Sequence, residues 1–283
     1  MTSKNEIESL IYLLEDPDPE IQSSVHNRLR ELGENAVPLL DQCRIQTSDD
    51  VEKELINDIL HKITFGTLYE DFSDLLEEGV DDLYRLEKAS LLLARFGNPT
   101  LRTEEYHRKL DRFAKEIYSD IAYKMSDDEK MRTLLRFVFR DLRFRGDEKN
   151  YHNPENAYLD RVIDRRKGLP ISLSLIVIFL GRRLDIPFHG VNMPIHFMLV
   201  YEGEGQETLI DPFDGGTIVT YDQCHYFLKK NGIDPKPEHL QKTSEREILT
   251  RSVRNLMHSY SKADKKEKVK DLQSLLQLIE LKG

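Results

Sequence analysis

A histidine and an aspartate are the two residues of this chain whose spacing most clearly predicts shared chemistry. His196 opens a strand-like run, His196–Tyr201, and Asp211 directly follows a second run, Thr208–Ile210. If the runs pair symmetrically about the glycine-bearing turn between them, the two side chains face each other, because opposed Cβ atoms in an antiparallel pair lie about 4.5–5.5 Å apart. The carboxylate would then orient the imidazole and raise its basicity. A nucleophile would be expected on a neighbouring element, commonly at a helix N-terminus.

The segments that precede this pair are expected to supply such a helix. Pro170 opens an apolar run, Ile171–Leu184, and proline is well tolerated at the first position of a helix. This run is apolar nearly all round, so we expect it to be buried, with Leu175, Ile178 and Phe179 in the core. A short helix, Leu159–Arg166, is expected before it. The turn cluster at 211–216 leads into a further β-prone run, 217–220.

Helical patterns occupy both ends of the chain. Residues 5–65 read as two helical pairs, which resemble a HEAT-type repeat or an ordinary helical hairpin. The glycines and acidic residues of 66–80 predict a connection. Three amphipathic helices are then expected, followed after residue 243 by a helical hairpin of roughly tetratricopeptide dimensions. The three helices are expected at Leu83–Phe96, Glu104–Met125 and Asp127–Leu142.

The motifs between residues 166 and 216 resemble the core of the transglutaminase-like (papain-like) superfamily. In that core, an Arg-x-Gly-x-Cys segment opens a helix that ends in a Gly-Ile-Pro-like turn, and strands carrying His and Asp-Pro follow. The corresponding segments here are Arg166–Pro170, Asp185–Pro187, His196-Phe197 and Asp211-Pro212. The wider string is similar to the SirB-type bacterial branch, which has a helical N-terminal part and a tetratricopeptide-like tail. The similarity covers about residues 85–280.

The resemblance implies an α+β fold in three parts. A helical, HEAT-like module is expected at 1–80, and a transglutaminase-like core of helices on a small antiparallel sheet at 81–240. A tetratricopeptide-like hairpin at 241–283 would close the chain.

The resemblance also implies a lost nucleophile, because the position that carries cysteine in catalytic members is Pro170 here. Proline has no thiol and no backbone N–H to donate to an oxyanion. Neither Cys43 nor Cys224 matches the motif. We therefore expect a non-catalytic regulatory protein that binds a protein or peptide. Pro170, Asn156 and Phe213 are expected in the binding site, and His196 and Asp211 would be vestiges of the catalytic one.

The alternative is a hydrolase or acyl-transferase that uses Ser172, or a water activated by His196. Ser172 and Ser174 follow Pro170 by two and four residues, and a helix that starts at Pro170 would let Ser172 face the imidazole, but helix hydroxyls commonly bond back to the first turn instead. A metal site built from His152, His189, His196 and Asp211 has no recognisable ligand spacing, so neither a metal nor a cofactor is expected.

Charge and composition limit the classes of partner and the cell compartment that we expect. The 41 Lys and Arg against 51 Asp and Glu give a net charge of −10, which argues against nucleic acid or an anionic membrane as partner. Two cysteines cannot form a disulfide framework and favour a reducing compartment. The N-terminal residues carry no apolar signal segment, and no apolar run is long enough to span a bilayer, so a cytoplasmic location is expected.

Overall fold

The computed structural model describes residues 4–13, 16, 18–121, 125–203 and 205–282. Its elements are mostly helices, with one four-stranded antiparallel sheet, so the fold is α+β, as the sequence predicts. The chain divides into two compact units. The first comprises residues up to 72 together with 94–101, and the second comprises 73–93 and residues from 102 onward. The C-terminal hairpin therefore lies in the same unit as the sheet.

The first unit is helical throughout. Its apolar residues recur at helical spacing and form one buried cluster, in which Ile7, Leu40, Ile56 and Leu60 are fully buried. This matches the helical pattern that the sequence shows over 5–65. Its elements are α1 (Lys4–Leu13), α2 (Pro19–Leu32), η1 (Gly33–Ala36), α3 (Val37–Gln46) and the larger part of α4 (Asp50–Glu77).

The connection predicted over 66–80 is wrong for most of its length, because α4 runs unbroken as far as Glu77. Leu68, Phe72 and Leu76 recur at helical spacing and are almost fully buried, so their packing maintains the helix through Gly66. Gly79, with φ of +89°, adopts a backbone conformation that favours glycine, and the chain turns there. The acidic residues that suggested a linker are compatible with a helix surface.

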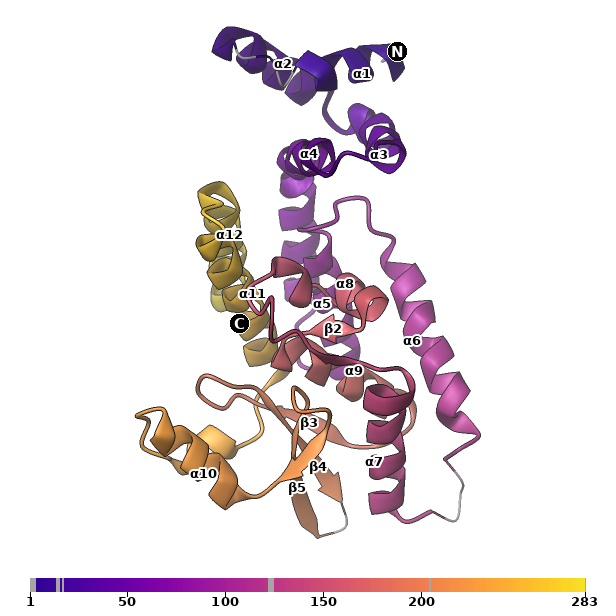
Figure 1. The fold of residues 1–283 in the computed structure, drawn as a ribbon, viewed down its shortest axis with the longest axis vertical. Helices are drawn as coiled ribbons and strands as arrows, with labels where there is room; N and C mark the ends of the chain where they lie inside the picture. The colour runs from indigo at the N-terminus through magenta and orange to yellow at the C-terminus, as the bar shows by residue number, and fades with distance from the viewer. Residues whose placement is uncertain (1–3, 14–15, 17, 122–124, 204, 283) are drawn as a thin grey trace. The chain divides into compact units, whose positions relative to one another are not determined.

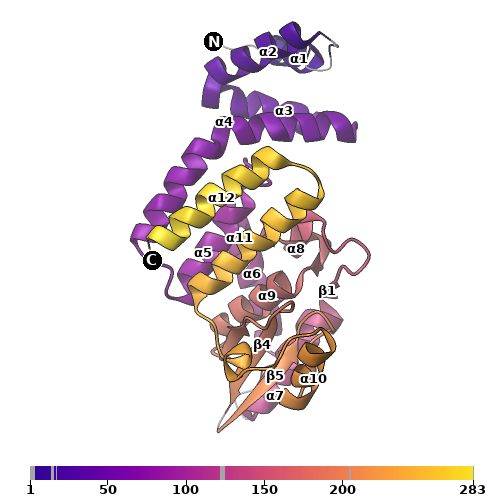
Figure 2. The same cartoon turned by 90° about the vertical axis from the view of Figure 1, so that its left-hand side faces the viewer.

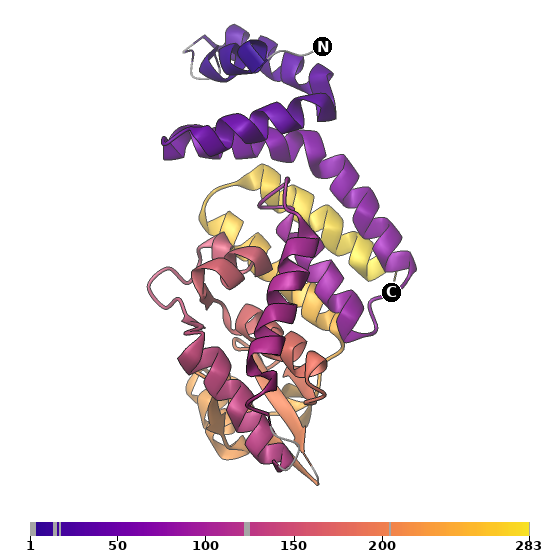
Figure 3. The same cartoon turned by 90° about the vertical axis from the view of Figure 1, so that its right-hand side faces the viewer.

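The second unit is organised around the apolar helix α9 (Pro170–Arg183). Leu175, Ile178 and Phe179 are buried as predicted, and the helix is buried on all sides from Pro170 to Gly181. Helix α6 and the α11–α12 hairpin lie on opposite sides of α9 (Figures 2 and 3). The helices of this unit are α5 (Leu83–Ala94), α6 (Thr103–Tyr118), α7 (Asp127–Arg136), α8 (Leu159–Arg165), α9, α10 (Tyr221–Lys230), α11 (Glu245–Lys262) and α12 (Lys266–Leu281).

Some helix ends differ from the predictions. Helix α6 ends at Tyr118, and part of its predicted C-terminal extension, 122–124, lies outside the described residues. Helix α7 ends at Arg136 and continues as a π-helical turn, η2 (Phe137–Asp141). The short 3₁₀ turns η3 (Pro154–Asn156) and η4 (Pro237–Leu240) complete the unit. In the described part of the chain, no helix combines the length and apolar character that a bilayer span requires.

The four strands of the sheet lie in the order β3-β4-β5-β6, all antiparallel (Figure 1). Met198, Val200 and Leu209 pack with Cys224 and Leu228 of α10 on one side, whereas α9 contacts β3 and β4. Strand β3 was not predicted, because its glycine and histidine interrupt the alternation of apolar residues. The strands are β3 (Phe188–Val191), β4 (Met198–Gly203), β5 (Gln206–Asp211) and β6 (Thr217–Val219).

A separate pair of two-residue strands was also missed. Strand β1 (Arg145–Gly146) lies parallel to β2 (Lys167–Gly168), and Gly146 pairs with Gly168. Two-residue strands carry no periodic signal, so only the tertiary structure reveals them. This pair matters for the site, because β2 leads directly into the N-terminus of α9.

The predicted register of the central hairpin is wrong by two residues. Leu199 pairs with Ile210, and this register, continued by one residue, sets Asp211 opposite Met198 rather than opposite His196. The prediction centred the hairpin between residues 203 and 204. The observed pairing centres it one position further along, and Gly205 there has φ of +80°. His196 therefore precedes β4 and reaches Asp211 from a turn.

Candidate functional site

The His196 imidazole is brought to Asp211 by a tight turn before β4. The backbone N–H of His196 donates to the carbonyl of Met193 at 3.2 Å, and Ile195 between them has φ of +59°. A β-branched residue in this left-handed region is strained, and such strain is concentrated at functional sites. His196 Nε2 lies 3.0 Å from Asp211 Oδ2, so the pair is joined directly.

Both oxygens of the Asp211 carboxylate accept hydrogen bonds, Oδ2 from His196 and Oδ1 from two backbone N–H groups. Its Oδ1 accepts hydrogen bonds from the backbone N–H groups of Phe213 at 2.9 Å and Asp214 at 3.2 Å. Burial raises the pKa of Asp211, but the hydrogen bond and charge of His196, together with these two N–H groups, outweigh burial and lower it below its ordinary value. A charged carboxylate accepts the proton of Nε2, which leaves Nδ1 as the nitrogen available to a water or ligand.

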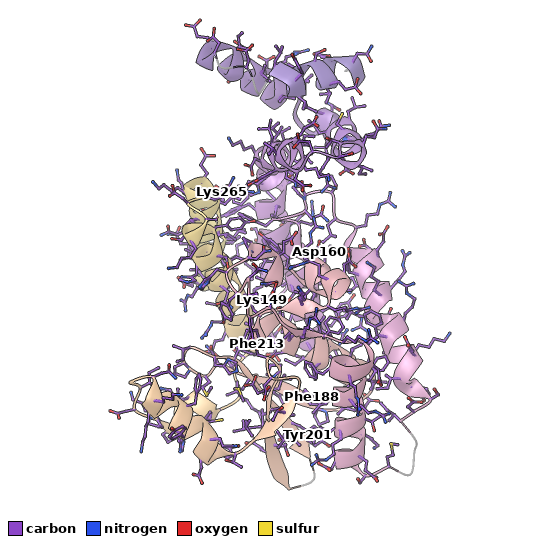
Figure 4. The ribbon with its side chains drawn as sticks, in the orientation of Figure 1. Lys149, Asp160, Phe188, Tyr201, Phe213 and Lys265 are labelled. Carbon is purple, nitrogen blue, oxygen red and sulfur yellow. The ribbon has the colours of Figure 1, made fainter. Side chains whose placement is uncertain are left out.

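Aromatic rings surround the imidazole. The Phe213 ring centroid lies 6.4 Å from that of His196, and the Phe227 centroid lies 5.8 Å from it. Tyr151 extends the cluster, with its ring centroid 5.7 Å from that of Phe213. In Figure 4, Phe213 and Lys149, which belongs to the same loop as Tyr151, are both labelled. Phe213 was predicted for this site, whereas Tyr151 and Phe227 were not singled out.

Phe213 also requires a glycine beneath it. A Cβ on Gly146 would lie only 2.5 Å from the Phe213 ring, so no other residue fits there without movement of the ring. Gly146 pairs with Gly168 in the β1–β2 ladder, and Gly168 is two residues before Pro170. This series of contacts links the rings around His196 to the segment that opens α9.

The N-terminus of α9 carries Pro170 at its first position and is buried. The Ser172 hydroxyl is 1% exposed; it donates to the carbonyl of Asn156 at 2.7 Å and accepts from the N–H of Leu169 at 2.9 Å. Its single proton is therefore engaged, and the hydroxyl caps the first turn of the helix. Ser174 likewise donates to the Pro170 carbonyl at 2.9 Å. Among the described residues, neither serine hydrogen-bonds to His196.

Asn156 lies in the wall that supports this helix terminus. It is fully buried, and its amide donates to the carbonyl of Asn150 at 2.7 Å and accepts from Arg165 at 3.1 Å. Arg165 also pairs with the buried Asp147 at 3.3 Å. These contacts give Asn156 a supporting position beside the α9 terminus, and its expected role in binding stays a prediction. Its carbonyl is used as well, since it accepts from Leu169 at 3.0 Å.

The predicted residues thus form two groups. The structure brings together His196, Asp211 and Phe213, and it places Pro170, Ser172 and Asn156 in a separate buried network. The polar segment at 143–158 supplies Gly146, Asp147 and Tyr151. Nothing in the sequence identifies Phe227, because only the packing of α10 on the sheet brings it to His196.

The histidines weighed as metal ligands lie apart. His152 packs edge-on against His258 with ring centroids 5.0 Å apart, and His189 pairs with Glu202 at 3.3 Å. Within the described residues, no group of three or more His, Cys, Asp and Glu side chains could hold a metal ion.

Comparison with known proteins identifies the family of this site. A family model described as the transglutaminase-like superfamily matches residues 104–254, which include the helix terminus, the His196 turn and Asp211. The chain belongs to the transglutaminase-like superfamily. The resemblance found in the sequence is confirmed at this level.

Several relatives within the superfamily share part of this chain. A UPF0162 protein of Vibrio cholerae is 28% identical over 173 residues, which is 60% of this chain and 64% of the relative. A UPF0162 protein of Pseudomonas aeruginosa is 33% identical over 198 residues, covering 68% of this chain and 72% of the relative. Human F-box only protein 21 is 35% identical over 99 residues, or 32% of this chain and 16% of the relative. No solved structure matches the chain.

Proposed function

We propose that this protein is a non-catalytic member of its superfamily that binds a protein or peptide at the His196 site. The observation that carries the proposal is the chemistry of the α9 terminus. Pro170 offers neither a nucleophile nor an N–H, and the nearby Ser172 hydroxyl is buried and engaged by Asn156 and Leu169. In the described part of the chain, neither Ser172 nor Ser174 hydrogen-bonds to the remaining His–Asp pair, and burial together with the charge of Asp211 raises the pKa of the Cys224 thiol, which disfavours its thiolate.

The surroundings of His196 favour binding of an apolar side chain. Ile195 is 52% exposed, and Tyr151 and Phe227 are each 37% exposed. Exposed apolar side chains that gather beside a polar pair are typical of interaction sites. The imidazole and the carboxylate would then supply hydrogen bonds to the backbone of a bound peptide.

The finer assignments are part of the same proposal. We place the protein in the SirB-type branch, with a HEAT-like N-terminal module and a tetratricopeptide-like α11–α12 hairpin in the cytoplasm. Two helical hairpins are compatible with repeat modules, whose extended surfaces suit protein binding. Helical repeat surfaces would add to the area available to a partner.

The alternative function is hydrolysis or acyl transfer by a water that His196 activates. The 3.0 Å bond between His196 and Asp211 favours it, because an oriented imidazole with a free Nδ1 can act as a general base. The hydrogen bonds of Ser172 count against the version in which the serine attacks.

The two functions are separated by parallel assays of turnover and binding. Amine incorporation into casein and hydrolysis of peptide and ester substrates should stay at the buffer rate for the wild type and for His196→Ala. Turnover that His196→Ala abolishes would replace the binding proposal with the hydrolase.

Binding is tested with a random peptide library selected on the wild-type protein. Selected peptides should bind at least tenfold more weakly to Phe227→Ala, since Phe227 lies beside His196. Tyr226→Ala is the matched control, because Tyr226 is the preceding residue on α10 and is 71% exposed. Peptides that bind both variants as they bind the wild type would show that the His196 site is not the binding surface.

A further inference from the structure

A groove of about 500 Å³ lies in the second unit, between the α7–η2 helix and the turn that joins β5 to β6. Three arginines, Arg132, Arg136 and Arg140, line one wall, and Gly216 and Ile218 line the other. Figure 1 shows α7 beside the sheet, and Figure 2 labels it near β5. The groove contains none of the residues assigned to the His196 site.

The three arginines form a positive row on a chain whose net charge is −10. Arg132 and Arg136 are four residues apart on α7, so they lie on one face of the helix at a rise of about 6 Å, and Arg140 follows in the π-helical turn η2. Arg132 pairs with Asp128 at 2.7 Å, whereas Arg136 only reaches 4.0 Å from Asp141. Arg140 makes no ion pair within the described part of the chain. The guanidinium groups of Arg136 and Arg140 can therefore bind anionic groups of a ligand.

Apolar side chains lie among the arginines. Leu135 and Phe139 come from the helix, and Ile218, which is 37% exposed, comes from β6. The Phe139 ring lies over Gly216, where a Cβ would be 2.5 Å from the ring. A small inorganic anion would use the arginines but would leave Ile218 in water. A ligand that fits both walls carries carboxylates on one side and apolar groups on the other.

The groove runs beside a free edge of the sheet. Strand β6 is the last strand of the sheet as described, whereas the opposite edge strand, β3, is bridged by Lys242 and by the N–H of Thr243. An exposed edge strand offers backbone groups to an added extended chain. An extended chain places every second side chain on the same side, about 6.6 Å apart, which is close to the spacing of the arginine row.

We propose that this groove binds an extended acidic segment of a partner protein. Acidic residues at every second position would face the arginine row, and the intervening apolar residues would face Ile218. The proposal goes beyond the His196 site and holds whether or not that site is catalytic.

The test uses the full chain and a fluorescein-labelled peptide in which four Glu-Val pairs alternate. We expect saturable binding by fluorescence anisotropy that weakens as salt is raised, because the contacts are ionic. The double variant Arg136→Glu/Arg140→Glu should bind at least tenfold more weakly. Ile218→Glu should also bind at least fivefold more weakly, since it removes the apolar contact and adds a negative charge.

The matched control is Arg108→Glu/Arg112→Glu on α6. These two arginines are exposed, four residues apart and without an ion pair among the described residues. This control variant has the same net charge as Arg136→Glu/Arg140→Glu. It should bind within twofold of the wild type. A peptide of the same composition with its four Glu and four Val in separate halves should bind at least fivefold more weakly.

Three results would overturn the proposal. The control variant could lose as much affinity as the groove variant, which would show a general effect of charge. The segregated peptide could bind as well as the alternating one, which would show that no extended register is recognised. A single-stranded oligonucleotide of equal charge could bind the groove more tightly than the peptide, which would assign the arginines to nucleic acid. Circular dichroism should show that all variants remain folded.

Discussion

At the scale of single residues, three positions determine what the site can do. Pro170 removes both the attacking group and an N–H from the helix terminus, while His196 and Asp211 keep the geometry of a general base. The strained Ile195 sets the direction of the imidazole. The site thus combines a preserved polar pair with a buried, inert terminus.

The first prediction is that Pro170→Cys creates a reactive thiol. A helix N-terminus favours thiolate, and an imidazole within reach would favour it further, so the pKa of the new thiol should fall below the ordinary value of about 8.5. The pH dependence of iodoacetamide alkylation measures it. The wild type is the background, since Cys43 and Cys224 are buried and burial, with Asp211, raises the pKa of the Cys224 thiol.

The double variant Pro170→Cys/His196→Ala tests the contribution of the imidazole. Its thiol should titrate at a higher pH than that of Pro170→Cys alone. An identical profile in the two variants would mean that His196 does not reach the helix terminus.

The second prediction concerns the strain at Ile195. Ile195→Gly should stabilise the protein by about 1 kcal/mol, because a left-handed conformation costs an ordinary residue about 1–2 kcal/mol. Urea unfolding gives the free energy. Ile218→Gly is the control, because Ile218 lies in the extended strand β6, where glycine relieves no strain. This variant should lower the stability of the protein by about 0.5–1 kcal/mol. A loss of stability in Ile195→Gly equal to that of the control would show that the turn stores no strain.

At the scale of elements, α9 is the structural centre of the second unit. It begins at the site and ends in two arginines, Arg182 and Arg183, that bind the fully buried Glu87 of α5. His107 of α6 binds the same carboxylate. One acidic side chain therefore joins three helices, and it fixes the end of α9 opposite to the site.

The third prediction tests the burial of α9. Leu175 is 3% exposed, so Leu175→Ala should cost about 2–5 kcal/mol through lost burial and the cavity that remains. The free energy of unfolding in urea measures the cost. Leu281→Ala, at a position that is 83% exposed, should change stability by less than about 0.5 kcal/mol. A cost below about 1 kcal/mol for Leu175→Ala would contradict a central role for this helix.

The fourth prediction concerns pH and Glu87. Burial alone would raise the pKa of Glu87, but hydrogen bonds from Arg183 and His107 and the charge of Arg182 lower it to about 2. A carboxylate with a lowered pKa in the folded state stabilises the protein at neutral pH. That contribution should be lost as the pH falls from about 4.5 toward 2.

Urea midpoints at pH 7, 4 and 2.5 measure this loss. Glu87→Gln should be about 3 kcal/mol less stable than the wild type at pH 7, because it leaves buried positive charge unpaired. It should also lose less stability between pH 4 and 2.5. Glu148→Gln, at an exposed position, should keep the wild-type profile. An unchanged pH dependence in Glu87→Gln would show that another group controls acid stability.

At the scale of the whole molecule, the division into units does not follow the chain order. The connection between α5 and α6, residues 94–101, belongs to the first unit. There Arg44 contacts Asn98 and Thr100, and Phe96 packs with its ring centroid 4.4 Å from that of His61. A boundary near residue 80 therefore separates this connection from its partners.

The fifth prediction follows from this division. A fragment comprising 81–283 should expose Phe96, which is 1% exposed in the full chain, and should bind the dye ANS more strongly than the full chain does. Phe96→Ser in the fragment should lower the dye signal. Equal dye binding by the fragment and the full chain would show that residues 81–283 fold without the N-terminal module, in agreement with the boundary near residue 80 that the sequence analysis expects.

The sequence by itself determined most of the helices, the two strands of the central hairpin and the family. Helical periodicity, the apolar helix after Pro170 and the strand-like runs were local patterns, and each appears in the structure. The order of His196 and Asp211 along the chain was enough to bring them together as a pair. These features depend on residues close in sequence, where propensity and periodicity carry information.

Only the tertiary structure decided the pairing register of β4 and β5, the continuity of α4 and the hydrogen-bond partners of the Ser172 hydroxyl. A turn displaced by one position shifts a strand pair by two residues, and the local pattern does not distinguish the alternatives. Packing of Leu68 and Phe72 overrode the glycine that suggested a linker. Asn156 and Phe227 are distant in the chain from the groups that they contact, so their positions depend on long-range packing that no local pattern encodes.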